Sequence, residues 1–157
     1  MRAVKTFEEF IGNGAVRKIN IDSERAKSLI FEAERKFNSL QETIKKIGIS
    51  DNNSNDYAEY CYNIIMLLVR ANMFEKGYMS SGQGAHEAEV SFTRKLGFNE
   101  AQIQFLDQLR YFRNGILYYG KRFDKEYAQK VLEFLDLQEH CQTRSTLTRF
   151  PNLSHLF

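Results

Sequence analysis

Apolar residues recur at helical spacing along most of this chain. Between residues 26 and 47 they fall three or four positions apart, with Glu, Arg and Lys between them, which predicts an amphipathic helix. Asp22 or Ser23 is placed to cap its beginning, and Gly48 to end it. The apolar face of this helix comprises Ala26, Leu29, Ile30, Ala33, Phe37, Leu40, Ile44 and Ile47.

The next helix is apolar around most of its circumference. It follows the polar stretch 50–55 and ends near Gly77. Helices of this kind are usually buried. We therefore expect it to lie centrally, or to contribute to an oligomer interface as well as to the core.

Three further helices are indicated by the residues that would cap them. A short helix over residues 85–96 is closed by Gly97, and Asn99 with Gln102 gives a capping-box-like start to a longer one. Asp124 is placed to cap a last helix. Short connections between these elements are typical of helical bundles.

The sequence therefore predicts an all-α protein, an antiparallel four-helix bundle with an additional short helix. We see no alternating strand pattern. The small-residue segment 80–84 has no strand signal before it and no Gly-Lys-Ser/Thr ending, so we interpret it as an interhelical linker, not a phosphate-binding loop. We assign residues 1–138 to the helical domain and 139–157 to a poorly patterned C-terminal tail.

Composition and charge exclude some classes of protein but do not indicate a function. The chain has 157 residues, 43% of them hydrophobic and 27% charged, as in one globular domain. Its formal charge of +2 is too small to indicate nucleic acid by itself. Cys61 and Cys141 lack metal-ligand spacing, and the apolar runs are too short to cross a bilayer. We expect a cytoplasmic protein with no metal, no cofactor and no membrane association.

The segment 110–122 carries the most chemistry, because basic side chains alternate with aromatic ones. Arginine offers a fixed fork of donors to phosphate, and aromatic rings offer faces for bases to stack on. The residues we predict to bind nucleic acid or a nucleotide are Arg110, Arg113, Tyr119, Lys121 and Arg122.

The order of motifs resembles the HEPN domain family, most closely its small stand-alone prokaryotic members. The motifs are Lys-Gly-Tyr at 76–78, Gln-Gly-Ala-His at 83–86, and a helix ending in Arg113-Asn114 followed by Tyr-Gly at 119–120. The resemblance covers roughly residues 22–137. It implies a dimerising antiparallel bundle that acts on RNA or nucleotides, often as the toxin paired with a small nucleotidyltransferase antitoxin.

Active members of this family use Arg, about four to six residues, then His as a metal-independent ribonuclease motif. Arg113 and Asn114 match its first two positions, but Tyr118 stands where the histidine belongs. The usual pKa of tyrosine is about 10, against about 6.5 for histidine, so an unshifted Tyr118 forfeits most acid–base assistance. Five residues on an ideal helix also means about 140° of rotation. Arg113 and Tyr118 converge only if the helix distorts near Gly115, or if a dimer partner completes the site.

Three functions remain open. The one we favour is a HEPN-like RNA- or nucleotide-binding protein with absent or reduced ribonuclease activity. The second is a helical dimerisation or protein-interaction module, in which Arg110 and Arg113 pair with carboxylates such as Asp107. The third is an active metal-independent ribonuclease toxin that uses Tyr118 or a histidine from elsewhere, such as His86. For partners we expect a second copy of the chain, RNA or a nucleotide, and a nucleotidyltransferase-type protein.

Overall fold

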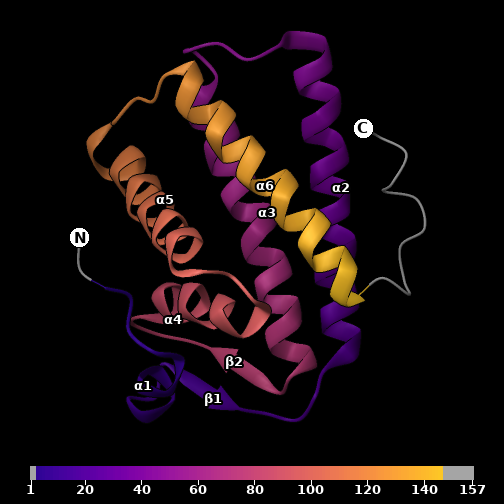
Figure 1. The fold of residues 1–157 in the computed structure, drawn as a ribbon, viewed down its shortest axis with the longest axis vertical. Coiled ribbons are helices and arrows are strands. Elements are labelled where there is room, and N and C mark those ends of the chain that lie inside the picture. Colours follow the sequence, from indigo (N-terminus) through magenta and orange to yellow (C-terminus); the bar gives the residue numbers. More distant parts are fainter. Residues whose placement is uncertain (1–2, 147–157) are drawn as a thin grey trace.

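The apolar second helix lies at the centre of the fold, as its composition predicted. The computed structural model describes residues 3–146, without the side chains of 117, 118 and 137–146. In it, α3 (Ser54–Glu75) packs beside α2 (Ser23–Ile47), and α6 (Lys125–Thr146) lies across α3 (Figure 1). Cys61 of α3 is fully buried, and burial raises the pKa of its thiol.

The predicted helix starts are confirmed by their hydrogen bonds. The Asp22 carboxylate accepts a first-turn backbone N–H of α2 at 3.0 Å. Asn99 and Gln102 exchange reciprocal bonds of 2.9 Å at the start of α5 (Glu100–Tyr119). Asp124 accepts a backbone N–H of α6 at 2.8 Å. These contacts are local in sequence, so spacing alone could identify them.

The predicted short helix forms in two parts. It begins as α4 (Ala85–Phe92), which packs against both α3 and α5. It then tightens into a 3-10 turn, η1 (Thr93–Leu96), and Gly97 follows with φ of 89°. A positive φ at this position is what glycine supplies most easily after a helix.

Two short strands correct our expectation that the chain has none. They are β1 (Val16–Lys18) and β2 (Tyr78–Ser80), which pair antiparallel. Three residues are too few to display a clear alternation, and the pairing joins segments about sixty positions apart. An unpredicted helix, α1 (Phe7–Gly12), precedes β1 and carries a capping box between Thr6 and Glu9. The described residues are otherwise mostly helical, as predicted.

Helix α6 also differs from expectation, because it continues to Thr146, past Gln138, where we expected regular structure to end. Residues 139–146 contain no glycine or proline, so nothing local stops the helix once apolar periodicity is lost. Residues 147–157 of the predicted tail lie outside the described part of the chain.

The N-terminal segment is tied onto the helical part by Arg94. Its guanidinium donates to the backbone carbonyls of Val4 at 3.0 Å and Lys5 at 2.9 Å, and to the Glu100 carboxylate at 2.7 Å. The Ser91 hydroxyl adds a 2.7 Å bond to the Lys5 carbonyl. Lys5 is therefore held beside α4 although it lies far from it in sequence.

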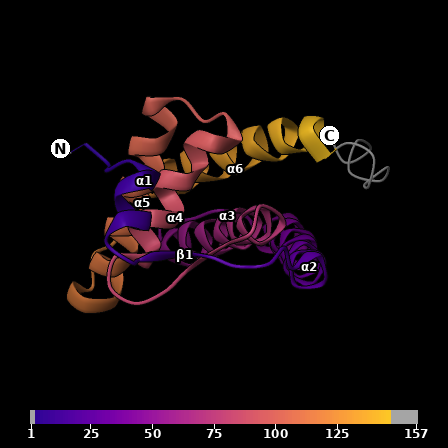
Figure 2. The same cartoon turned by 90° about the horizontal axis from the view of Figure 1, so that it is seen from below.

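Viewed from below, α2 and α3 form one layer and α6 lies over it, while α1, β1 and α4 gather at the near end (Figure 2). This end, where α5 also meets α4, contains the polar side chains described next.

Within residues 3–146, no helix combines the length and apolarity needed to cross a membrane.

The close approach of two backbones at Gly77 gives a test of this fold. Gly77 has φ of +73°, and a Cβ added there would lie 2.8 Å from the carbonyl oxygen of Ile19. We expect Gly77→Ala to lower the free energy of unfolding by about 1–3 kcal/mol, because both the φ and the contact become strained.

Gly12→Ala is the matched control, since Gly12 is helical and a Cβ there meets nothing within 4 Å. We expect this change to be neutral or slightly stabilising. Urea unfolding followed by circular dichroism compares the two. Equal stability of both variants would contradict the close approach at Gly77.

Candidate functional site

Helix α5 places Arg110 toward α4. Both Nε and Nη2 of its guanidinium lie 2.7 Å from Oδ1 of Asp107, one turn earlier. The Arg110 side chain is 23% exposed. A guanidinium has five N–H donors, and Asp107 contacts only two of its three nitrogens, so within the described part of the chain Nη1 keeps its donors for another group. The predicted pairing with Asp107 is confirmed, but it does not occupy every N–H donor of Arg110.

Arg113 is instead held against α3. Its Nε lies 3.3 Å from Oε1 of Glu59, an ion-pair distance, yet this nitrogen makes no hydrogen bond with any described residue. The guanidinium carbon lies 5.7 Å from the ring centroid of Tyr62, within cation–π range. A carboxylate and an aromatic ring of α3 thus hold the arginine that best matches the HEPN motif.

A buried carboxylate connects three neighbouring elements. Glu89 of α4 has a side chain only 4% exposed, and it accepts bonds of 2.8 and 3.0 Å from the guanidinium of Arg70 in α3. The Ser80 hydroxyl of β2 donates to it at 2.7 Å, and Nδ1 of His86 lies 3.2 Å away. Since an ionised carboxylate is costly to bury without partners, this set of donors is what permits Glu89 to remain inside.

Tyr62 of α3 is the aromatic ring beside the Arg113 guanidinium. The residue is 2% exposed, and its hydroxyl has no hydrogen-bond partner among the described residues. Burial raises the pKa of Tyr62 to about 12, and the charge of Glu89 acts in the same direction. The charges of Arg110, Arg113 and Arg70 oppose that rise, because they favour the ionised phenol. The Tyr62 phenol therefore stays neutral near pH 7.

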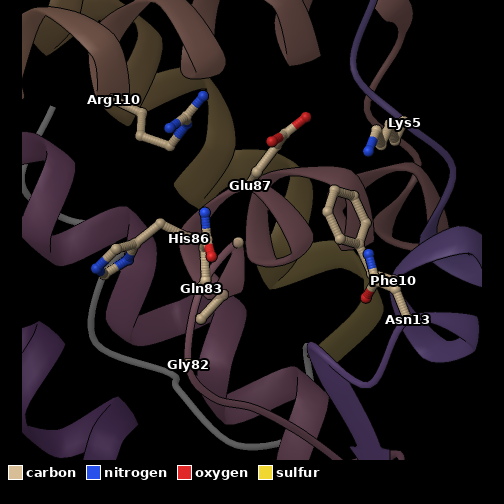
Figure 3. A pocket seen from close by; sticks show the side chains of 10 residues that line it. Lys5, Phe10, Asn13, Gly82, Gln83, His86, Glu87 and Arg110 are labelled. Atoms are coloured by element: carbon tan, nitrogen blue, oxygen red, sulfur yellow. The ribbon is translucent and has the colours of Figure 1, made fainter.

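A cavity of about 580 Å³ opens beside these groups. It lies where the N-terminal segment, the loop before α4 and α5 meet, and Figure 3 shows His86 and Arg110 on one side and Lys5, Phe10 and Asn13 on the other. The lining residues are Lys5, Phe10, Asn13, Gly82, Gln83, Gly84, Ala85, His86, Glu87 and Arg110.

His86 belongs to both the cavity and the buried network. Its side chain is 56% exposed, and in Figure 3 its imidazole points away from Lys5 and Phe10. A carboxylate can only accept, so the contact with Glu89 favours a proton on Nδ1 and leaves Nε2 as the acceptor of the neutral ring. Nη2 of Arg70 also lies 3.4 Å from Nδ1, but the Glu89 oxygen is closer.

The other predicted site residues whose side chains the structure describes do not line the cavity. Asn114 and Arg122 are exposed, and Tyr119 is 82% exposed. The Lys121 ammonium lies 5.9 Å from the ring centroid of Tyr111, at the C-terminal end of α5. These residues form an exposed basic and aromatic surface at that end of the helix.

The side chain of Tyr118 lies outside the described part of the structure. Helix α5 continues without interruption through Gly115, so the rotation of about 140° between Arg113 and Tyr118 remains. The chain brings Arg110 and His86 to one cavity, but not Arg113 and Tyr118 to one helix face.

Two parts of the cavity were not predicted. We interpreted residues 80–84 as a linker because no strand was visible before them, yet Ser80 ends β2 and residues 82–84 line the cavity. No sequence pattern near Lys5 indicated its place in the site, because contacts with Arg94, which is distant in sequence, bring Lys5 to the cavity. A charged residue within an otherwise apolar helix, as with Arg70, was the one signal that could have indicated the buried network.

Within the described residues, no group of three or more His, Cys, Asp or Glu side chains is arranged to hold a metal ion. No protein-family model matches the sequence, and neither a curated protein nor a solved structure is significantly similar to it. Function must therefore be argued from the geometry of this site.

Removing Arg70 tests the buried pair. We expect Arg70→Ala to lower the free energy of unfolding at pH 7 by about 2 kcal/mol. This is less than for a fully enclosed pair, because the Arg70 side chain is 34% exposed. The loss arises because Arg70→Ala leaves the buried Glu89 carboxylate without its guanidinium partner.

Arg35→Ala is the control, since Arg35 makes the same two-bond contact with Glu32, at 2.8 and 2.7 Å, on the exposed face of α2. We expect little change from it. Denaturant unfolding at pH 7 measures both variants. An Arg70→Ala cost no larger than that of Arg35→Ala would count against a buried pair at Glu89.

Proposed function

We propose that this protein is a HEPN-like RNA- or nucleotide-binding protein whose degenerate motif provides absent or reduced ribonuclease activity. The observation that carries the proposal is the cavity lined by Arg110 and Lys5, with His86 at its edge. Its volume of about 580 Å³ lies within the range of about 300–1,000 Å³ typical of small-molecule sites. It can accommodate a nucleotide or one unit of a strand.

The charge of the lining supports an anionic ligand. Lys5 and Arg110 contribute two positive charges against one negative charge from Glu87, and protonation of His86 would add a third positive charge. Arginine binds phosphate through its N–H donors, and among the described residues Nη1 of Arg110 makes no hydrogen bond.

In this proposal, a single strand of RNA bound in the cavity continues along α5. Asn114 is four residues after Arg110, so the two are neighbours on one helix face, and Tyr111 lies beside them. Tyr111 and Tyr119 are both exposed, and Lys121 covers one side of the Tyr111 ring. Exposed aromatics next to cations suit base stacking and backbone contacts in single-stranded nucleic acid.

Reduced activity at the motif follows from the position of Arg113. Glu59 and Tyr62 hold its guanidinium against α3, and Tyr118 is rotated by about 140° along the same helix. A single chain therefore does not assemble these two residues. The proposal includes an antiparallel four-helix arrangement of α2, α3, α5 and α6, with α4 as the additional short helix. It also includes a homodimer and a nucleotidyltransferase-type partner of a toxin–antitoxin pair.

A helical interaction module is the second candidate, and one observation favours it. Both arginines of α5 have carboxylate partners, Asp107 for Arg110 and Glu59 for Arg113. If these pairs are purely structural, the protein should show no affinity for RNA or nucleotides even at low salt, where electrostatic binding is strongest.

The two candidates predict opposite results for variants of the Arg110 pair. In fluorescence anisotropy with a labelled single-stranded RNA at low salt, we expect Arg110→Ala to weaken binding about tenfold and lower the salt slope by about one. Asp107→Asn should strengthen binding, because it removes the carboxylate that competes with phosphate for Arg110.

Arg17→Ala is the control, because Arg17 is an exposed arginine of β1 that does not line the cavity. It changes the net charge by the same amount, and we expect it to leave the dissociation constant within about twofold of the parent value. No binding by the parent protein would favour the interaction module, and equal losses in both arginine variants would exclude a specific site at Arg110.

A further inference from the structure

Two charged side chains of the cavity have no partner in the described part of the chain. Glu87 of α4 and Lys5 of the N-terminal segment are partly buried in the lining, yet neither side chain makes a hydrogen bond or ion pair with another described residue. The charged side chains of the 3-10 turn after α4 are paired, Arg94 with Glu100 and Lys95 with Glu8. A few polar groups of this kind fix the orientation of a ligand in a binding cavity.

The backbone holds both of these charged groups at the cavity. Glu87 cannot turn away with its helix, because Glu89 of the same helix is buried and bonded to Arg70. Lys5 is held through its carbonyl, which accepts a bond of 2.9 Å from Arg94. With Arg110 of α5, three charged groups from three parts of the chain line one cavity.

The order of these charges matches one unit of an RNA strand. In the view of Figure 3, the Glu87 carboxylate is seen between the Arg110 guanidinium and the Lys5 ammonium. The charges therefore run positive, negative, positive across the lining. In RNA each ribose, with its 2′-hydroxyl, lies between two phosphates. The two orders are complementary, because cations bind phosphate and a carboxylate accepts a hydrogen bond from a hydroxyl.

A site for phosphate alone has no use for Glu87, because like charges repel. A ribose hydroxyl is a neutral donor that suits an unpaired carboxylate, and an acidic residue holds the ribose 2′-hydroxyl in many dinucleotide-binding sites. The base extends away from the sugar–phosphate backbone. A carboxylate placed between two phosphate-binding groups therefore meets the sugar before it meets the base.

Resting on the proposed function, we propose that Glu87 accepts a hydrogen bond from a ribose 2′-hydroxyl, between two phosphates bound by Arg110 and Lys5, and so selects RNA over DNA. The 2′-hydroxyl is the group by which a protein distinguishes these two nucleic acids at a given site. Glu87 is thus a specificity residue, and no chemical step is required of it.

The test measures fluorescence anisotropy of the full chain at low salt with three labelled strands of equal length: oligouridine, its 2′-deoxy form and its 2′-fluoro form. All three carry the same base and phosphates, and the 2′-fluoro form keeps an RNA-like sugar that cannot donate. We expect the parent to bind oligouridine about tenfold more tightly than either modified strand, as for one hydrogen bond to a charged group.

Three variants of the cavity divide the roles. Glu87→Ala should reduce the preference for oligouridine to about twofold or less. Glu87→Gln should keep an intermediate preference, because its amide oxygen still accepts a hydrogen bond but carries no charge. Lys5→Ala should weaken binding of all three strands by the same factor, since each carries the same phosphates.

Glu126→Ala is the matched control. Glu126, like Glu87, is an acidic residue in the first turn of its helix, but it is exposed and does not line the cavity. It should keep the preference of the parent. Equal binding of the three strands by the parent, an unchanged preference in Glu87→Ala, or the same loss in Glu126→Ala overturns this inference and leaves the proposed function standing. Absence of binding to every strand overturns both.

Discussion

The buried carboxylate of Glu89 is the constraint on which this end of the molecule depends. Removing an ionised carboxylate from water costs several kcal/mol unless charged and polar donors replace the water. Those donors come from Arg70 in α3, Ser80 in β2 and His86 in α4, so the three elements must meet at one point. This requirement fixes where α4 begins and places the loop 82–84 at the wall of the cavity.

Most helices were predictable because the contacts that define them are local. Asn99 and Gln102 are three positions apart, and their reciprocal bonds need no other part of the chain. The pairing of β1 with β2 joins distant segments through three residues each, so no pattern in either segment indicated it. The expected end of the last helix was wrong for a related reason. Apolar periodicity indicates which residues of a helix are buried, and α6 continues past Gln138, where that periodicity ends.

Part of the candidate site could be predicted from the sequence. Arg110 was identified by its chemistry, since an arginine among aromatics suggests phosphate or base contacts. The motif pair was expected to be Arg113 with Tyr118 on the same helix, and His86 was named only as an alternative histidine, because a motif compares positions along one chain segment. The structure brings His86 of α4 and Arg110 of α5 to the lining of one cavity, a relation that depends on how α4 and α5 pack and on the buried Glu89. Sequence spacing alone cannot supply that relation.

The pairing of Arg110 with Asp107 is compatible with ligand binding, and the magnitudes explain why. Neither side chain is fully buried, and partly exposed pairs of this kind contribute about 1 kcal/mol or less. A phosphate offers several charged oxygens to the same guanidinium, in the parallel geometry that arginine prefers. Asp107 therefore orients Arg110, and a pair of this strength does not oppose the phosphate binding that we propose. Arg113 differs, because the ring of Tyr62 and the carboxylate of Glu59 hold it against α3, where a ligand in the cavity has no described route to it.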